Sequence, residues 1–139
     1  MNPQLVKDWM THNPVTITEN TPLPEAFRLM NKNNIRRLPV IKHNKVVGIV
    51  TWGDIREASA SDATSLSVFE LHYLMEKVRA ARFMTRNPIT VTPTTTIARA
   101  AQLMLEHKIS GLPVVKDEKL VGILTESDIF RMLVSSNAA

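Results

Sequence analysis

The chain has 139 residues, a length that suits one ordinary domain or two very small ones. Its formal net charge of +4 is spread through both halves, and aromatic residues make up only 5% of it. We therefore do not expect a nucleic-acid-binding face. Cysteine is absent, which excludes disulfides, thiolate nucleophiles and cysteine-ligated metals. No segment has the length of a membrane span and the N-terminus resembles no signal peptide, so we expect a cytoplasmic protein.

The first part of the chain predicts elements in the order β-α-β-β-α. Residues 16–18 alternate and are β-branched, which is typical of a short strand. Thr21 is a suitable N-cap for a helix with Pro22 at its first position. The apolar face of this helix would comprise Leu23, Ala26, Phe27 and Met30. Residues 38–41 and 46–50 predict a β-hairpin, and the sequence of its turn does not indicate the turn type. A second helix should run from about residue 51 to 57.

This order of elements occurs twice. Of the 46 residues from Met10 to Ile55, 22 are identical to the residue 74 positions later, with no gap. We place the first repeat at 6–57, an inter-repeat loop and helix at 58–79, and the second repeat at 80–135. Residues 1–5 and 136–139 are terminal extensions. A single repeat is too small to bury enough surface, so we expect one α/β (α+β) module of pseudo-twofold symmetry, with sheets that draw on both repeats.

The segment between the repeats has no counterpart within them. Residues 58–65 are small and polar and predict a loop, and Ser67 with Glu70 forms a capping-box pattern. The helix that follows has an apolar stripe comprising Leu71, Leu74, Met75 and Val78. This stripe could pack on the rest of the module or meet another subunit, and the sequence leaves both alternatives open.

Each repeat closes with an apolar run that contains a glycine, followed by Thr-x-x-Asp. The glycines are Gly48 and Gly122, and a glycine within a strand often marks the close approach of another group. The Thr–Asp pairs are Thr51 with Asp54 and Thr125 with Asp128. One interpretation is a capping box that satisfies the helix's own N–H groups. The other is a ligand site at a helix N-terminus, which favours polar or anionic guests.

The paired repeats, each with a Leu-Pro-Val segment and a closing Gly-Ile-x-Thr-x-x-Asp, resemble a tandem cystathionine-β-synthase (CBS) domain pair, the Bateman module. The helix between the repeats resembles that of stand-alone pairs of the acetoin-utilisation type, some of which carry a further C-terminal regulatory domain. Because this chain ends in Ser135-Ser136-Asn137-Ala138-Ala139, we expect none here.

The resemblance implies a regulatory sensor of adenosine-containing ligands such as AMP, ADP, ATP or S-adenosylmethionine, bound in clefts between the repeats. It assigns the ribose hydroxyls to Asp54 and Asp128, with Thr51 and Thr125 contacting ribose or phosphate. The adenine pockets would then comprise Val15, Ile17 and Val40 in one repeat, and Ile89, Val91 and Val114 in the other. The chemistry agrees, because a carboxylate can accept hydrogen bonds from both hydroxyls of a cis-diol.

The two repeats differ just before Leu-Pro-Val. The first has Arg36 and Arg37 where the second has Ser110 and Gly111. Family members often place His or Arg there, directed at ligand phosphates, so the two sites should differ in affinity for charged ligands. The alternative is that both arginines are solvated charges at a strand end.

The sequence offers no further chemistry. The four histidines lack metal-ligand spacing, and we find no glycine-rich phosphate loop, nucleophile or acid–base pair. We therefore predict a non-catalytic sensor with no required cofactor or metal that passes its ligand state to an unknown regulated protein. The competing hypothesis is an oligomerisation or interaction scaffold with vestigial ligand sites. The resemblance also implies a homodimer.

Overall fold

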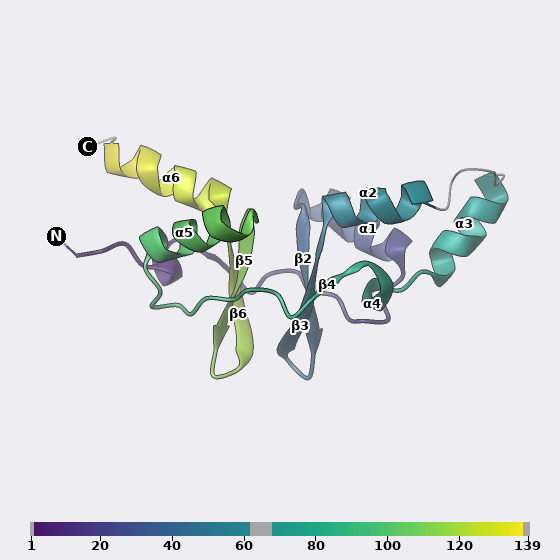
Figure 1. Cartoon of the computed structure of the whole chain (residues 1–139), viewed down its shortest axis with the longest axis horizontal. Coiled ribbons are helices and arrows are strands. Elements are labelled where there is room, and N and C mark those ends of the chain that lie inside the picture. The colour runs from purple at the N-terminus through teal and green to yellow at the C-terminus, as the bar shows by residue number, and fades with distance from the viewer. Residues whose placement is uncertain (1, 62–67, 138–139) are drawn as a thin grey trace. The chain divides into compact units, whose positions relative to one another are not determined.

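The computed structural model describes residues 2–61 and 68–137, and it comprises two compact units (Figure 1). The first-repeat unit is Val15–Asn87, and the second-repeat unit combines Met1–Pro14 with Pro88–Ala139. Each unit contains one three-stranded sheet and helices, which confirms the predicted mixed α/β fold. The units follow the repeats closely but not at their first residues, because residues 6–14 belong to the unit built on the second repeat.

The first-repeat unit is built on an antiparallel hairpin of β2 (Arg37–Lys42) and β3 (Lys45–Thr51). Its sheet has the order β2-β3-β4, with β4 at Thr85–Arg86. The two turn residues, His43 and Asn44, both have positive φ, at 53° and 66°. Positive φ at both central residues of a two-residue loop is the signature of a type I′ turn, which matches the twist of the strands. The predicted hairpin is confirmed, and its turn type is settled.

The second-repeat unit repeats this arrangement with β5 (Gly111–Lys116) and β6 (Lys119–Thr125). Its turn residues, Asp117 and Glu118, also have positive φ. The third strand is β1 (Thr11–His12), which pairs with β6. Each sheet thus takes its third strand from the first residues of the other repeat. The prediction that the sheets draw on both repeats is confirmed.

The first strand predicted in each repeat is reduced to an isolated parallel bridge. Ile17 pairs with Val40, and Val91 pairs with Val114. The Ile17 N–H donates to the Pro39 carbonyl at 3.0 Å, and the Ile17 carbonyl accepts from Ile41 at 2.9 Å. The neighbouring residues make no ladder, so these segments are extended but too short to be strands.

The helices mostly follow the predicted pattern. In the first-repeat unit they are α1 (Leu23–Asn33), α2 (Trp52–Ser61), α3 (Val68–Lys77) and α4 (Ala80–Phe83). In the second-repeat unit they are η1 (Val6–Asp8), α5 (Ile97–His107) and α6 (Glu126–Asn137). The expectation of a loop from residue 58 is wrong for 58–61, because α2 continues to Ser61; residues 62–65 and Ser67 lie outside the described part of the chain. Within the described residues, no helix is long and apolar enough to cross a membrane, and a cytoplasmic location stays a prediction.

The N-cap of α1 lies one residue later than the predicted Thr21. The cap position is Pro22, and the Thr21 hydroxyl instead accepts a hydrogen bond from the Thr18 N–H at 3.0 Å. Thr21 is therefore used to close the preceding turn. In α5 the corresponding cap is Thr96, whose hydroxyl accepts from the Arg99 N–H at 3.1 Å. The second repeat thus has a side-chain cap that proline cannot supply in the first.

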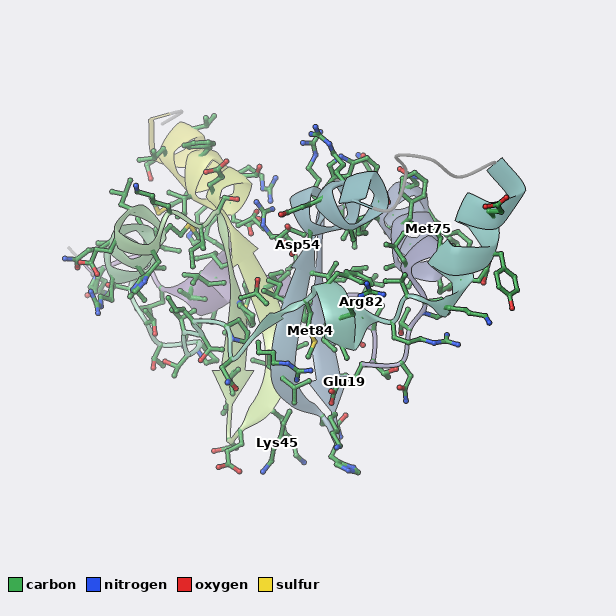
Figure 2. All side chains as sticks on the ribbon, turned by 45° about the vertical axis from the view of Figure 1, so that its right-hand side comes forward. Glu19, Lys45, Asp54, Met75, Arg82 and Met84 are labelled. Atoms are coloured by element: carbon green, nitrogen blue, oxygen red, sulfur yellow. The ribbon has the colours of Figure 1, made fainter. Side chains whose placement is uncertain are left out.

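The core of the first-repeat unit also settles part of the question about the inter-repeat helix. Met75 and Val78 of α3 are buried with Leu23, Ala26 and Met30 of α1. Figure 2 shows Met75 on the side of α3 directed toward α1. The stripe therefore packs on its own unit at these two positions, while the side chains of Leu71 and Leu74 lie outside the described part of the structure.

Candidate functional site

The Thr–Asp pairs lie where the last strand of each hairpin passes into a helix. Thr51 ends β3 and Asp54 lies in the first turn of α2; Thr125 ends β6 and Asp128 lies in the first turn of α6. Figure 2 shows Asp54 at the end of the hairpin opposite Lys45, which begins β3 beside the turn. Free N–H groups at a helix start favour polar or anionic partners.

Asp54 and Thr51 form a reciprocal capping box. The Asp54 Oδ2 accepts a hydrogen bond from the Thr51 N–H at 2.9 Å, and the Thr51 hydroxyl accepts from the Asp54 N–H at 3.2 Å. The capping interpretation of this motif is therefore realised in the first repeat. Within the described residues, Asp54 Oδ1 accepts no hydrogen bond, so this oxygen remains available to another donor.

Asp128 uses both of its carboxylate oxygens. Its Oδ2 accepts from the Thr125 N–H at 2.8 Å and from the Thr125 hydroxyl at 3.2 Å. Its Oδ1 is hydrogen-bonded and ion-paired to the Arg131 guanidinium. Only 2% of Asp128 is exposed, whereas Asp54 is half-buried. The two carboxylates thus have the same place in the fold but different surroundings.

Arg131 is a residue that our sequence reasoning missed. The detectable signal was Asp-x-x-Arg on a helix, a spacing that brings the two side chains together. The residue 74 positions earlier is Glu57, which cannot donate a hydrogen bond to Asp54 as a carboxylate. The difference between the repeats therefore extends beyond Arg36 and Arg37.

Those two arginines lie at the same end of the sheet as Thr51. Arg37 is the direct strand partner of Thr51, and the Arg36 carbonyl accepts from the Trp52 N–H at 2.9 Å. Arg36 is exposed and Arg37 is half-buried. In the other repeat, Gly111 pairs with Thr125 in the same register. The structure thus brings the predicted phosphate-binding arginines beside the Thr51–Asp54 turn and leaves the equivalent positions without charge.

The six predicted adenine-pocket residues divide into buried and partly exposed side chains. Ile17 and Val91 are 4% and 5% exposed, and Val40 and Val114 are fully buried in the cores of their units. Val15 and Ile89 are half-buried. Contact of these side chains with adenine stays a prediction, and Val15 and Ile89 have the most surface for it.

An aromatic pair lies beside the first-repeat motif. Trp52 stacks on Phe27, with ring centroids 5.1 Å apart and the planes at 29°. Phe27 is on the predicted apolar face of α1, yet it is 42% exposed, and its partner Trp52 at the start of α2 is half-buried. Helical spacing placed Leu23, Ala26 and Met30 correctly in the core, but Phe27 is exposed and spacing could not identify its contact with Trp52.

A polar hollow of about 520 Å³ lies in the first-repeat unit at the hairpin turn. Its lining residues are Thr18, Glu19, Asn20, Ile41, Lys42, His43 and Asn44. None of the predicted site residues lines it. Within the described residues, no group of three or more His, Cys, Asp or Glu side chains could hold a metal ion.

Known relatives resemble this chain over nearly all of its length. It is 35% identical over 130 residues to an L-aspartate semialdehyde sulfurtransferase of Methanocaldococcus jannaschii, covering 92% of this chain but 23% of that protein. The chain thus spans about a quarter of that relative. It is also 33% identical to a CBS domain-containing protein of Dictyostelium discoideum, covering 94% of this chain and 91% of that one.

Two solved structures are similar in both sequence and fold. The CBS domain pair of protein MJ0100, in complex with 5′-methylthioadenosine and S-adenosyl-L-methionine, has a TM-score of 0.84 at 34% identity, covering 98% of this chain and 100% of that one. CBSX2 in complex with AMP has a TM-score of 0.79 at 30% identity, covering 96% and 98%. The CBS domain profile matches residues 6–61 and 78–135, and the chain therefore belongs to the CBS domain family as a tandem pair of these domains.

Proposed function

We propose that this chain is a non-catalytic regulatory module that binds adenosine-containing ligands at its Thr-x-x-Asp turns and transmits ligand state to a partner protein. The candidates are AMP, ADP, ATP and S-adenosylmethionine. The observation that carries the proposal is the duplicated turn, which occupies the same place in each unit. The similarity to pairs that hold 5′-methylthioadenosine, S-adenosyl-L-methionine and AMP supports this ligand class.

Each turn has the chemistry to hold a nucleoside. A carboxylate can accept hydrogen bonds from both hydroxyls of a ribose cis-diol, and each such bond to a charged group contributes about 1.5–3 kcal/mol. Thr51 and Thr125 place a hydroxyl beside each carboxylate. Arg36 and Arg37 would add positive charge for ligand phosphates in the first repeat. The half-buried Val15 and Ile89 would offer apolar surface to adenine.

Some relatives have enzyme names and are much longer than this chain. The chain corresponds to about a quarter of the sulfurtransferase, so that activity cannot be ascribed to the shared part. We propose that the shared part regulates and does not catalyse. A ligand that binds one state of the module more tightly than another would shift the population of the two states, which a partner could read.

The second candidate function is an interaction scaffold with vestigial ligand sites. Two observations favour it: Asp54 and Thr51 already satisfy each other as a capping box, and α6 exposes apolar side chains. These are Phe130, Leu133 and Val134, at 58%, 48% and 70% exposure. A homodimer formed through its helices is compatible with either function.

Calorimetric titration with AMP, ATP, S-adenosylmethionine and 5′-methylthioadenosine separates the two candidates. A sensor should give saturable heat with at least one of them. A ligand at 100 times its dissociation constant should also stabilise the fold by about 2.7 kcal/mol in a thermal-unfolding assay. Absence of both responses for all four ligands would reject the sensor and favour the scaffold.

A further inference from the structure

The two Thr-x-x-Asp turns share their backbone framework but differ in the availability of their carboxylates. Both aspartates accept a hydrogen bond from the threonine N–H through Oδ2, at 2.9 Å for Asp54 and 2.8 Å for Asp128. The difference lies in Oδ1. Asp128 Oδ1 is taken by Arg131, whereas Asp54 Oδ1 has no donor among the described residues.

We propose that Arg131 determines the occupancy of the second-repeat site by competing with the ligand's ribose for Asp128. This inference rests on the proposed function, since it concerns the same ribose site. The Asp54 site is ready to accept a diol, and the Asp128 site accepts one only after Arg131 leaves Oδ1. The second-repeat site therefore binds adenosine ligands more weakly for a reason that is independent of ligand phosphate.

The competition follows from the acceptor capacity of a carboxylate. An ionised carboxylate has about four lone-pair positions, and Asp128 already uses three of them for Thr125 N–H, Thr125 hydroxyl and Arg131. The two hydroxyls of a ribose diol need two free acceptor positions on the carboxylate, both facing the ribose. Asp128 is only 2% exposed and Arg131 occupies its Oδ1, so a diol would have to replace Arg131 at this oxygen.

Arg131 is suited to being displaced. Its side chain is 64% exposed, so the guanidinium can turn into water without breaking a core contact. Because the guanidinium of Arg131 is largely in water, it can exchange with a ligand hydroxyl at Asp128, and we expect the competition to weaken ligand binding several-fold without abolishing it. The corresponding Glu57 in the first repeat offers Asp54 no donor, which makes the two repeats a matched pair.

The test uses the full chain carrying Asp54→Ala, so that Asp128 is the remaining site, and titrates it with AMP and with 5′-methylthioadenosine. Adding Arg131→Met, which keeps the length of the side chain but removes its donors, should tighten binding of both probes about three- to tenfold. Arg131→Lys keeps a hydrogen-bond donor, so this variant should bind both probes more weakly than the Arg131→Met variant does. Arg99→Met removes an exposed arginine that bonds Gln102 on α5, and should leave affinity unchanged.

The reciprocal substitution tests the same idea in the other repeat. In the otherwise unchanged chain, Glu57→Arg should weaken the tighter binding event by a similar factor, because it introduces the competing donor at Asp54. Thermal unfolding of each variant identifies any that fail to fold.

The outcomes distinguish the competition from the proposed function. If the unaltered chain binds none of the four ligands named above, the proposed function and this inference both fall; if it binds another ligand but neither probe, this inference alone falls. If it binds, but Arg131→Met leaves affinity unchanged or lowers it, the competition is overturned and the sensor stands. A loss confined to AMP would mean that Arg131 contacts phosphate, which also overturns it.

Discussion

Gly48 lies directly against Met84, so that a Cβ placed on this glycine would be 2.6 Å from the methionine Sδ and 3.0 Å from the Thr85 carbonyl oxygen. Gly122 has the same relationship to Met10, at 2.6 Å from Sδ. Each glycine is thus the point where the first residues of the other repeat cross the hairpin and add a short strand. The sequence predicted a close approach at these glycines, and the approaching group is the chain itself.

Gly48→Ala should destabilise the first-repeat unit by about 1–3 kcal/mol, because the added methyl group overlaps Met84 and the backbone of β4 cannot yield freely. Chemical denaturation monitored by circular dichroism measures this loss. Gly53→Ala is the matched control, since its Cβ would lie 3.7 Å from the Thr51 hydroxyl in ordinary contact. In a helix this control should be neutral or stabilising by up to about 1 kcal/mol. Equal effects at both glycines would contradict the crossing argument.

Asp54→Ala and Asp128→Ala separate capping from ligand binding. Loss of the cap alone should cost about 0.5–2 kcal/mol of stability and leave ligand affinity nearly unchanged. If the carboxylate also holds the ribose, affinity should fall by about 1.5–3 kcal/mol, or roughly ten- to a hundredfold. We expect at least one variant to lose a calorimetric binding event while its melting temperature shifts little. If both variants have lowered melting temperatures and unchanged ligand affinity, the motif serves only as a helix cap.

Arg36 and Arg37 should discriminate among ligands by their phosphates. Replacing both with alanine should weaken ATP and ADP binding much more than adenosine binding, and should reduce the loss of ATP affinity with added salt. Calorimetric titrations at two ionic strengths measure both effects. An equal loss for all three ligands would show that the arginines support the fold instead.

The chain should form a homodimer. The exposed apolar side chains Phe130 and Val134 on α6 favour burial against a second copy, and isolated chains seldom leave large apolar patches in water. Sedimentation over a concentration series should give twice the 15.6 kDa chain mass above micromolar protein. A species that stays at 15.6 kDa throughout this range would contradict the prediction.

The Glu25–Arg28 pair on α1 gives a prediction about pH. Arg28 donates to both Glu25 carboxylate oxygens, at 2.8 Å and 2.5 Å, and this hydrogen bonding lowers the pKa of Glu25. A lowered folded-state pKa means that the pair's stabilisation is present above the unfolded pKa and fades as the pH falls through the folded one. An NMR titration should show the Glu25 pKa rising toward its ordinary value in Arg28→Ala. An unchanged Glu25 pKa would mean that the pair does not persist in solution.

Local sequence determined much of this protein. The hairpins, the helix faces and the Thr-x-x-Asp turns follow from patterns within a few positions, because spacing decides which side chains share a face. The repeat follows from comparing the sequence with itself at an offset of 74 residues. A candidate aspartate could therefore be placed at one end of each hairpin, and the two arginines at that end of the first hairpin. Even the glycine contacts were expected in kind, because a bare backbone in a strand invites close approach.

Only the tertiary structure shows which residues far apart in the sequence are in contact. Strand β1 pairs with β6, and only the folded chain shows that Thr11 lies opposite Ile123 rather than within its own repeat. The same holds for Phe27 against Trp52, where helical spacing names a face but not its partner. The unequal carboxylates of Asp54 and Asp128 depend on which side-chain donors reach them in space, and the Thr-x-x-Asp motif does not include the residue three positions after the aspartate that makes the difference.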